Sequence, residues 1–277
     1  MTYGTLYLCA TPIGNLQDIT LRVLETLEAV DLVACEDTRK TLQLLNHFNI
    51  SKPVTSYYEH NKMTKGDVII QHLKDGKNVA LVSDAGMPGV SDPGYDLVQQ
   101  CLAEDIPFTV LPGPVAAITA LVLSGLPTDR FCFEGFIPRH KKERQQYFER
   151  LLNEERTMIF YESPHRLEDT LKTMMEVFPD RAMAAARELT KKFEEIVRGT
   201  PAEVLAHFEA NGIRGEFVLL LHGAEPTVPE ARDLDWAVNR VAQLEAEGIS
   251  QKDAIKQAAK EADLSKRDVY NFIVQNK

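Results

Sequence analysis

Short apolar runs alternate with amphipathic stretches through the first 112 residues. The apolar runs predict strands at residues 5–10, 31–35, 54–56, 79–82 and 108–111. Between them, apolar residues recur with helical spacing, which predicts helices at residues 19–29, 41–48, 64–74 and from residue 96 onward. Thr20 is expected to cap the first of these helices. This alternation predicts a parallel sheet with helices on both faces, in a first α/β domain over residues 1–112.

The pattern changes after Pro127, where predicted strands follow one another closely enough to pair directly. These strands are expected at residues 131–136, 157–161, 181–187, 194–198 and 217–221. Helices are expected at residues 147–154, 167–177 and 202–210, the last of them capped at Gly212. Residues 137–144 are interpreted as a basic loop. We therefore expect a second α/β domain over residues 113–224, built on a mixed sheet.

The last part of the chain has a different pattern. Residues 224–230, which include Pro226 and Pro229, are expected to form a linker. Three short helices are then predicted at residues 235–247, 252–263 and 266–274, with Ser250 and Ser265 as caps of the last two. Together they predict a small helix-turn-helix-like domain over residues 231–277. The alternative is a helical tail that docks on the body or on a second subunit.

Composition narrows the classes of protein that remain. The formal net charge is −10, so nucleic acid must be contacted through local basic patches rather than by the whole surface. The four cysteines are far apart, which is typical of buried thiols in a reduced, cytoplasmic protein. The longest apolar stretch, residues 115–126, is too short to span a membrane. The seven histidines are scattered, and no metal site is expected.

Four short turns at predicted strand ends share small and stiff residues. They are residues 11–15, 85–90, 112–116 and 215–217. Loops at the carboxyl ends of strands in an open α/β sheet are where ligands bind. Neither the GxxxxGK[ST] nor the GxGxxG phosphate-binding pattern occurs. A cleft lined by these turns suits a ligand that combines an adenosine and an amino acid in a folded shape.

Eight motifs occur in an order that is similar to one known family. They are Thr11-Pro-Ile-Gly-Asn, Glu36-Asp-Thr-Arg, Ser83-Asp-Ala-Gly-Met-Pro, Asp92-Pro-Gly, Leu111-Pro-Gly-Pro, Phe160-Tyr-Glu-Ser-Pro-His-Arg, Ala186-Arg-Glu-Leu-Thr-Lys and Gly215-Glu-Phe. The chain resembles the ribosomal RNA small subunit methyltransferase I family, within the tetrapyrrole-methylase fold group. Met87 is a departure, because threonine is expected there more often.

The resemblance implies a fold, a cofactor and an activity. S-adenosylmethionine would bind between two α/β domains, and the protein would methylate the 2′-oxygen of a cytidine in the decoding region of 16S rRNA. The expected partners are 16S rRNA within the small ribosomal subunit and a second copy of the chain. The implied cofactor contacts are Ile13, Gly14, Ala85, Gly86, Met87, Val90, Val115, Ala116, Glu162, Glu188, Glu216 and Phe217.

Some of these contacts have plainer interpretations. Ile13 and Val115 can be core residues, and Glu162 and Glu188 can be partners in surface salt bridges. The transfer needs the 2′-oxygen to be held in line with the methyl–sulfur bond, and its proton must leave. The candidate bases are Glu36, Asp37, Glu162, His165 and Glu188, and the sequence does not choose among them.

Basic residues near these motifs are the candidates for RNA contact. Arg39, Arg166, Arg187 and Lys191 are predicted to clamp phosphates. Residues 139–144 hold four Lys and Arg against one Glu, so Arg139, Lys141, Lys142 and Arg144 are predicted to bind phosphates as well. Lys266 and Arg267 form a weaker second site, and each of these charges can instead be solvated surface.

Two other functions share these features. A methylase of small tetrapyrroles would use the same cleft, but would have less reason for a basic loop and a helical tail. A non-catalytic RNA-binding or ribosome-binding protein would not bind the cofactor at all. Mapping of 2′-O-methyl groups on small-subunit RNA separates the three.

Overall fold

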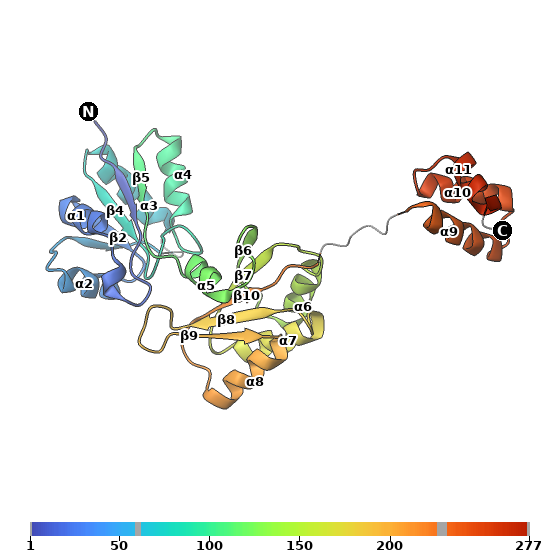
Figure 1. Cartoon of the computed structure of the whole chain (residues 1–277). Coiled ribbons are helices and arrows are strands. Elements are labelled where there is room, and N and C mark those ends of the chain that lie inside the picture. Colours follow the sequence, from blue (N-terminus) through green and yellow to red (C-terminus); the bar gives the residue numbers. More distant parts are fainter. Residues whose placement is uncertain (1, 59–61, 226–231, 276–277) are drawn as a thin grey trace. The chain divides into compact units, whose positions relative to one another are not determined.

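The structure is a computed structural model that describes residues 2–58, 62–225 and 232–275, with the side chains of residues 62–64 left aside. It consists of two compact units, Met1–Ala224 and Glu225–Lys277, which are described separately (Figure 1). We refer to the first as the body and to the second as the C-terminal unit. The linker residues predicted around Pro226 and Pro229 lie outside the described residues.

The first sheet of the body is entirely parallel, as predicted. Its strands are β1 (Leu6–Cys9), β2 (Leu32–Cys35), β3 (Val54–Ser56), β4 (Val79–Val82) and β5 (Phe108–Leu111). Their order across the sheet is β3-β2-β4-β1-β5, so β4 and β1 are central strands. All four residues of β4 are buried, which explains its unbroken apolar sequence.

Helices cover both faces of this sheet. They are α1 (Leu21–Ala29), α2 (Thr38–His47), α3 (Lys62–Lys74) and α4 (Tyr95–Ala103). Because side chains alternate along a strand, Leu81 of β4 packs with residues of α3 and α4, whereas Val82 packs with residues of α1 and α2. Thr20 caps α1 by accepting a hydrogen bond from the backbone of Val23, as predicted.

The second sheet is mixed, also as predicted. It contains β6 (Phe131–Phe136), β7 (Thr157–Glu162), β8 (Met183–Arg187), β9 (Glu195–Gly199) and β10 (Phe217–Leu221), in the order β6-β7-β10-β8-β9. Of the neighbouring strands in this sheet, β6 and β7 pair in parallel, and the other three pairs are antiparallel. The chain passes from the first sheet to the second between β5 and β6, but the body is one compact unit.

The helices of this half are α5 (Ala116–Ser124), α6 (Lys141–Arg150), α7 (Leu167–Val177) and α8 (Pro201–Asn211). Residues of α5 pack on one face of the sheet, and those of α6, α7 and α8 pack on the other. Thr200 and Glu203 form a reciprocal capping box at the start of α8, and Gly212 caps its end as predicted.

The prediction for residues 137–154 was wrong in its boundaries. A loop to residue 144 and a helix at residues 147–154 were expected, but α6 already begins at Lys141 and ends at Arg150. The helix buries two side chains, Arg144 and Phe148, four residues apart on one face. One of the two is charged, so the apolar periodicity of this helix is incomplete in the sequence.

The C-terminal unit contains α9 (Leu234–Ala246), α10 (Gln251–Glu261) and α11 (Lys266–Gln275). These helices share a small core of their own, made largely of alanine, valine and leucine. Ser250 and Ser265 accept hydrogen bonds from the backbones of Asp253 and Asp268, so both predicted caps are confirmed. No helix within the described parts of the chain is both long and apolar enough to cross a membrane.

Candidate functional site

The turns that follow β1 and β4 are joined by hydrogen bonds. The backbones of Thr11 and Gly86 pair through N···O distances of 2.9 and 3.0 Å. The Thr11 hydroxyl donates to the carbonyl of Ser83 at 3.2 Å, and the Ser83 hydroxyl donates to the carbonyl of Gly86 at 3.0 Å. Gly86 has a φ of 85°, a conformation that any other residue adopts only with strain. Two of the predicted turns thus form one rigid unit.

The first turn also contacts the second sheet. Ile13 packs against a cluster formed by α5, β8 and β10. A Cβ atom on Gly14 would lie 2.6 Å from Cγ of Lys191 and 2.8 Å from the carbonyl oxygen of Leu189. This close approach, and not backbone conformation, is what requires glycine at position 14. It brings the first turn next to the loop between β8 and β9.

The remaining turns lie beside these two. A Cβ atom on Gly86 would be 3.5 Å from the carbonyl oxygen of Pro114, and one on Gly113 would be 2.8 Å from the Cβ atom of Ala10. Gly215 has a φ of 78°, and a Cβ atom there would overlap the carboxylate of Glu188. The structure therefore brings the four predicted turns and the loop after β8 close together.

The predicted cofactor contacts differ in how much of their side chains they expose. Ala85, Val90 and Glu216 are exposed, whereas Phe217 is 1% exposed and packs in the core against Phe208. Any contact from Phe217 to a ligand must therefore come from its backbone. The other apolar side chains among the predicted cofactor contacts are half-buried: Ile13, Met87, Val115 and Ala116.

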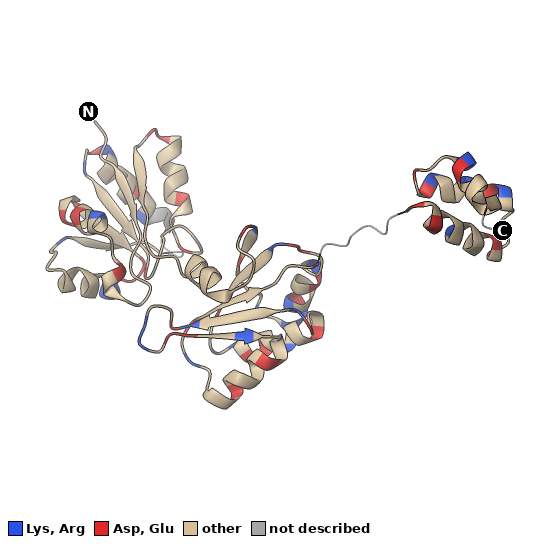
Figure 2. Cartoon of the chain, viewed as in Figure 1, with Lys and Arg blue, Asp and Glu red and all other residues tan. Residues whose placement is uncertain are grey.

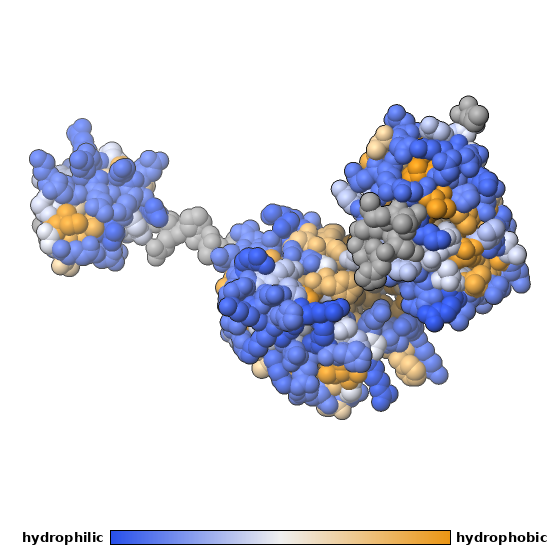
Figure 3. Space-filling model, turned by 180° about the vertical axis from the view of Figure 1, so that it is seen from behind, coloured by the Kyte–Doolittle hydropathy of each residue, from blue (hydrophilic) through white to orange (hydrophobic). Residues whose placement is uncertain are grey.

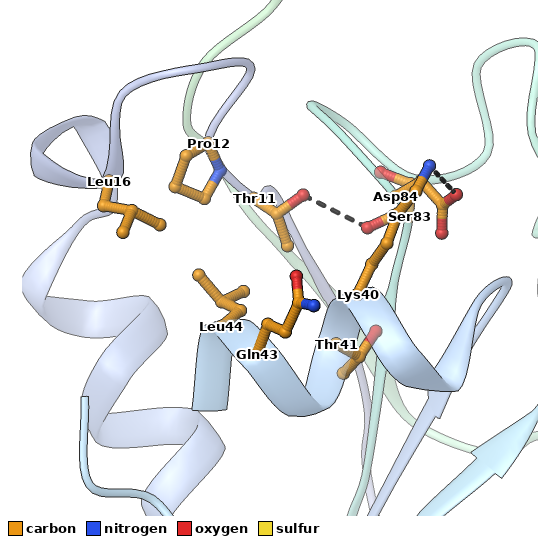
Figure 4. A pocket seen from close by; sticks show the side chains of 9 residues that line it. All are labelled: Thr11, Pro12, Leu16, Lys40, Thr41, Gln43, Leu44, Ser83 and Asp84. Atoms are coloured by element: carbon orange, nitrogen blue, oxygen red, sulfur yellow. Dashed lines mark hydrogen bonds and ion pairs between the residues drawn. The ribbon is translucent and has the colours of Figure 1, made fainter. Parts of the chain in front are cut away.

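A cavity of about 230 Å³ opens beside these turns (Figure 4). Pro12, Leu16 and Leu44 supply apolar wall, and Gln43 and Lys40 supply polar groups from α2. Its full lining is Thr11, Pro12, Leu16, Lys40, Thr41, Gln43, Leu44, Ser83 and Asp84. The predicted site residues do not include Leu16, Lys40, Gln43 or Leu44, although the helical spacing of residues 40, 43 and 44 next to the Glu36–Arg39 motif indicates that these three share one face.

The polar end of the cavity is held by an ion pair. Lys40 Nζ lies 2.7 Å from Asp84 Oδ2, and Asp84 Oδ1 accepts a hydrogen bond from the backbone of Asp37 at 3.0 Å. These bonds connect the start of α2 to the end of β4. The cavity can hold a flat group with an apolar face and a polar edge.

Carboxylates gather next to the cavity and change one another's pKa. Burial and the nearby charges of Glu36 and Asp84 raise the pKa of Asp92 to about 7. Burial, and next the charge of Asp84, raises the pKa of Glu36. Hydrogen bonds from Arg39 lower the pKa of the half-buried Asp37 to about 2. Asp92 was not among the predicted bases, because its burial and its neighbours exist only in the folded chain.

Glu162 has a structural role in this arrangement. It is 2% exposed and accepts hydrogen bonds from Thr170 Oγ1 at 2.7 Å and from the backbone of Ser163 at 2.7 Å. Arg166 lies 2.8 Å from the same carboxylate and also donates to the carbonyl of Ile137 at 2.6 Å. The carboxylate, at the end of β7, therefore faces the start of helix α7 rather than an open site, which argues against Glu162 as a base and against Arg166 as a phosphate clamp.

The other predicted bases are less enclosed. His165 is exposed and has no hydrogen-bond partner within the described parts of the chain. Glu188 pairs with Lys191 at 2.9 Å and sits at a positive φ of 52°. Among the described residues, no group of three or more His, Cys, Asp or Glu is arranged to hold a metal ion.

The predicted RNA contacts separate into buried and exposed side chains. Arg144 is 3% exposed, and it donates to Thr173 Oγ1 at 2.9 Å and to the carbonyl of Arg139 at 3.2 Å. This burial argues against Arg144 as an RNA contact, because its guanidinium is enclosed between α6 and α7. Arg187 is similarly engaged, by Glu195 at 2.6 Å and by the carbonyl of Gly212 at 2.7 Å.

Other predicted contacts lie on the surface. Arg39 pairs with Asp37 at 2.8 Å, and Lys141 lies 3.5 Å from Glu176. The remaining exposed members are Arg139, Lys142 and Lys191 in the body and Lys266 and Arg267 in the C-terminal unit. Basic positions are scattered among acidic ones in both units (Figure 2).

Comparison with known proteins agrees with this arrangement. The model of the family "Tetrapyrrole (Corrin/Porphyrin) Methylases" matches residues 5–205. A protein named ribosomal RNA small subunit methyltransferase I from Halalkalibacterium halodurans is 48% identical over 276 residues, covering 98% of this chain and 95% of that protein.

A relative of the same name from Thermotoga maritima is 47% identical over 222 residues, which are 80% of this chain and all of that protein. A similar solved structure is uroporphyrin-III C-methyltransferase from Thermus thermophilus, complexed with S-adenyl homocysteine. The match covers 78% of this chain and 97% of that chain, with a TM-score of 0.53 and 17% sequence identity. The fold, the family model and the close relatives agree, and the chain belongs to the ribosomal RNA small subunit methyltransferase I family of the tetrapyrrole methylases.

Proposed function

We propose that this protein transfers a methyl group from S-adenosylmethionine to the 2′-oxygen of a cytidine in the decoding region of 16S rRNA, in the cytoplasm. Membership of the family supports methyl transfer to small-subunit ribosomal RNA. The observation that carries the proposal is the convergence of the turns after β1, β4 and β5 on one place, where Gly14, Gly86 and Gly113 allow close backbone approach.

These turns fit the proposed cofactor. Ala85 and Val90 present exposed apolar surface, and the half-buried Ile13, Met87 and Val115 lie in the neighbouring turns. Such a surface suits an adenosine, and the carboxylates of Glu36, Asp84 and Asp92 lie near enough to one another to form a region of negative charge. When bound, the cofactor supplies an electrophilic methyl group on a positively charged sulfur, which that region stabilises.

The chain's own residues must hold the ribose and accept its proton. We place the target base in the cavity, because Pro12, Leu16 and Leu44 offer apolar wall for a flat ring and Lys40, Gln43 and Asp84 can bond its edge. Asp92 joins Glu36 and His165 as a candidate proton acceptor. Its pKa of about 7 suits a group that gains and loses a proton near neutral pH.

We also propose that the protein forms a homodimer. On α5, Val122 is 72% exposed and Ile118 is 42% exposed, whereas Ala117 and Leu121 of the same helix are buried. The body also shows apolar surface between polar regions in Figure 3. An exposed apolar helix face of this kind is typical of a contact between proteins. Analytical sedimentation at micromolar concentration measures the assembly, and a monomer would contradict it.

Cofactor binding is best tested at Ala85, because its side chain is exposed and its replacement need not disturb the fold. Substitution at Gly86 would strain the backbone, since its φ is 85°. We expect Ala85→Phe to abolish S-adenosylmethionine binding in calorimetry by filling the site. Ala103→Phe, at an exposed alanine at the end of α4, is the matched control and should bind normally. Equal affinity in both folded variants would contradict the assigned position.

The substrate is tested by mass mapping of methyl groups on small-subunit RNA after incubation with the purified protein and S-adenosylmethionine. We expect one new 2′-O-methylcytidine, in the decoding region. Methylation of a base would contradict the proposed chemistry. Cofactor binding without any RNA methylation would favour a small-molecule methylase, and the absence of cofactor binding would favour a non-catalytic RNA-binding protein.

A further inference from the structure

The loop between β8 and β9 is held in a defined shape. The backbone nitrogen of Lys191 donates to the carbonyl of Glu188 at 3.0 Å, and that of Glu194 donates to the carbonyl of Lys191 at 3.1 Å. The backbone of Thr190 donates to the Glu194 carboxylate at 2.6 Å. Leu189 is 6% exposed and anchors the loop in the core beneath it. An ordered loop of this kind can present a side chain without a large entropic cost on binding.

The side chain that this loop presents is an aromatic ring. Phe193 is 74% exposed, although phenylalanine is a large apolar residue. Single exposed apolar residues are common, and Leu21 on α1 is 78% exposed. Exposure alone therefore does not indicate a binding site. Phe193 differs from Leu21 because it follows two lysines and its loop packs against Gly14 of the first turn.

A lysine lies beside the ring. Lys192 Nζ lies 5.6 Å from the centroid of the Phe193 ring, and within the described parts of the chain it forms no salt bridge. Lys191, which was predicted to clamp a phosphate, instead pairs with Glu188. Because Arg144, Arg166 and Arg187 are also engaged within the fold, Lys192 is a better candidate for phosphate contact than these predicted residues.

We propose that Phe193 stacks on an unpaired base of the RNA substrate next to the target nucleotide, while Lys192 contacts the adjoining phosphate. Proteins commonly bind single-stranded RNA by combining exposed aromatic rings, which stack on bases, with cations that follow the backbone. The ring and the ammonium group occur here side by side on an ordered loop at the edge of the gathered turns. This inference rests on the proposed function, because it requires that the substrate is RNA.

The first test compares RNA affinities of full-length variants. A base–aromatic stack contributes about 1–3 kcal/mol, so Phe193→Ala should weaken binding to small-subunit RNA by roughly 5- to 150-fold. Phe193→Tyr should bind within about twofold of the unchanged protein, because a ring is kept. Leu21→Ala, at an equally exposed apolar residue, is the control and should have no effect. S-adenosylmethionine affinity should be the same in all four proteins.

Salt dependence separates the two residues. Lys192→Gln should reduce the slope of log affinity against log salt by about 0.7 for one lost contact to a single strand. Phe193→Ala should leave the slope unchanged, because stacking releases no counterions. If Lys192→Gln keeps the original slope, the phosphate contact is wrong.

Fluorescence tests stacking directly. The chain has one tryptophan, Trp236, so a Trp236→Phe, Phe193→Trp double variant places the sole indole at the loop. Stacking on a base should quench its emission when small-subunit RNA is added. Unquenched emission at saturating RNA would overturn the inference.

Failure of this inference can be told apart from failure of the proposed function. If the unchanged protein neither binds nor methylates small-subunit RNA, the proposed function falls. If the unchanged protein methylates RNA normally and Phe193→Ala binds RNA equally well, only the stacking role is contradicted. A change in sedimentation of Phe193→Ala with unchanged RNA affinity would assign the ring to a contact between two copies of the chain.

Discussion

Three arginines in the second half of the body use the same arrangement. Arg144, Arg166 and Arg187 each bond one side chain and one backbone carbonyl, and the carbonyls belong to Arg139, Ile137 and Gly212. The guanidinium fork can satisfy both acceptors at once, which the single ammonium of a lysine does with less geometric specificity. These charged residues therefore position loops and helix ends, although in the sequence they resemble RNA contacts.

Asp92 is expected to make stability depend on pH. Its pKa is raised from 3.8 to about 7 in the folded protein, so the folded state binds more protons than the unfolded state between these values. Stability should therefore fall as pH rises from about 4 to about 7 through this group. Asp92→Asn removes the charge, so its stability relative to the unchanged protein should be higher at pH 8 than at pH 4.

Thermal unfolding at pH 4, 6 and 8 measures this effect. Asp180→Asn, at an exposed carboxylate, is the control and should change stability little at any of these pH values. A stability difference for Asp92→Asn that stays constant with pH would show that the carboxylate is not protonated in the folded state near neutral pH.

Among the elements, α6 shows how a polar sequence forms a buried helix. Phe148 is fully buried against Phe160 and Phe178, and Arg144 lies one turn earlier on the same face. Tyr147 adds a hydrogen bond to the carboxylate of Glu134 at 2.9 Å. The helix is thus held in place by aromatic contacts of Phe148 and Tyr147 and by polar contacts of Arg144 and Tyr147 rather than by an apolar stripe.

Two substitutions on α6 separate fold from RNA contact. Arg144→Ala should destabilise the body by roughly 1–3 kcal/mol, because Thr173 and the carbonyl of Arg139 lose a charged donor. Lys142→Ala, two residues earlier and exposed, should leave stability within about 0.5 kcal/mol. Urea unfolding measures both. If the two variants were equally stable, Arg144 would not hold α6 in place.

At the scale of the whole molecule, the chain has separate cores for separate units. The cores of the two sheets lie within residues 1–224, and α9, α10 and α11 enclose a core of their own. The relative from Thermotoga maritima matches only 222 residues of this chain, and these span the full length of the Thermotoga maritima protein. A family member therefore exists at a length that corresponds to the body.

A chain shortened to end at Ala224 is expected to fold and to bind S-adenosylmethionine with unchanged affinity, because every predicted cofactor contact lies in the body. Circular dichroism and calorimetry of the shortened and full-length proteins measure this. RNA affinity should fall only by the contribution of Lys266 and Arg267. An unfolded product would show that α9–α11 are needed for the body to fold.

Most of the secondary structure and both types of sheet follow from the sequence alone, because strand burial and helix amphipathicity produce local periodicity. β4 was found from four consecutive apolar residues, and the cap at Thr20 from one side chain before a helix. The motifs likewise indicate the family, since the order of short sequence motifs can be read without coordinates.

The roles of the charged residues, in contrast, depend on the three-dimensional fold. Arg144 and Glu162 are buried by partners 29 and 8 residues away, and no local pattern distinguishes them from exposed charges. The raised pKa of Asp92 and the exposure of Phe193 likewise depend on distant segments. The physical reason is that burial and electrostatic environment are set by three-dimensional neighbours, whereas periodicity is set by neighbours in sequence.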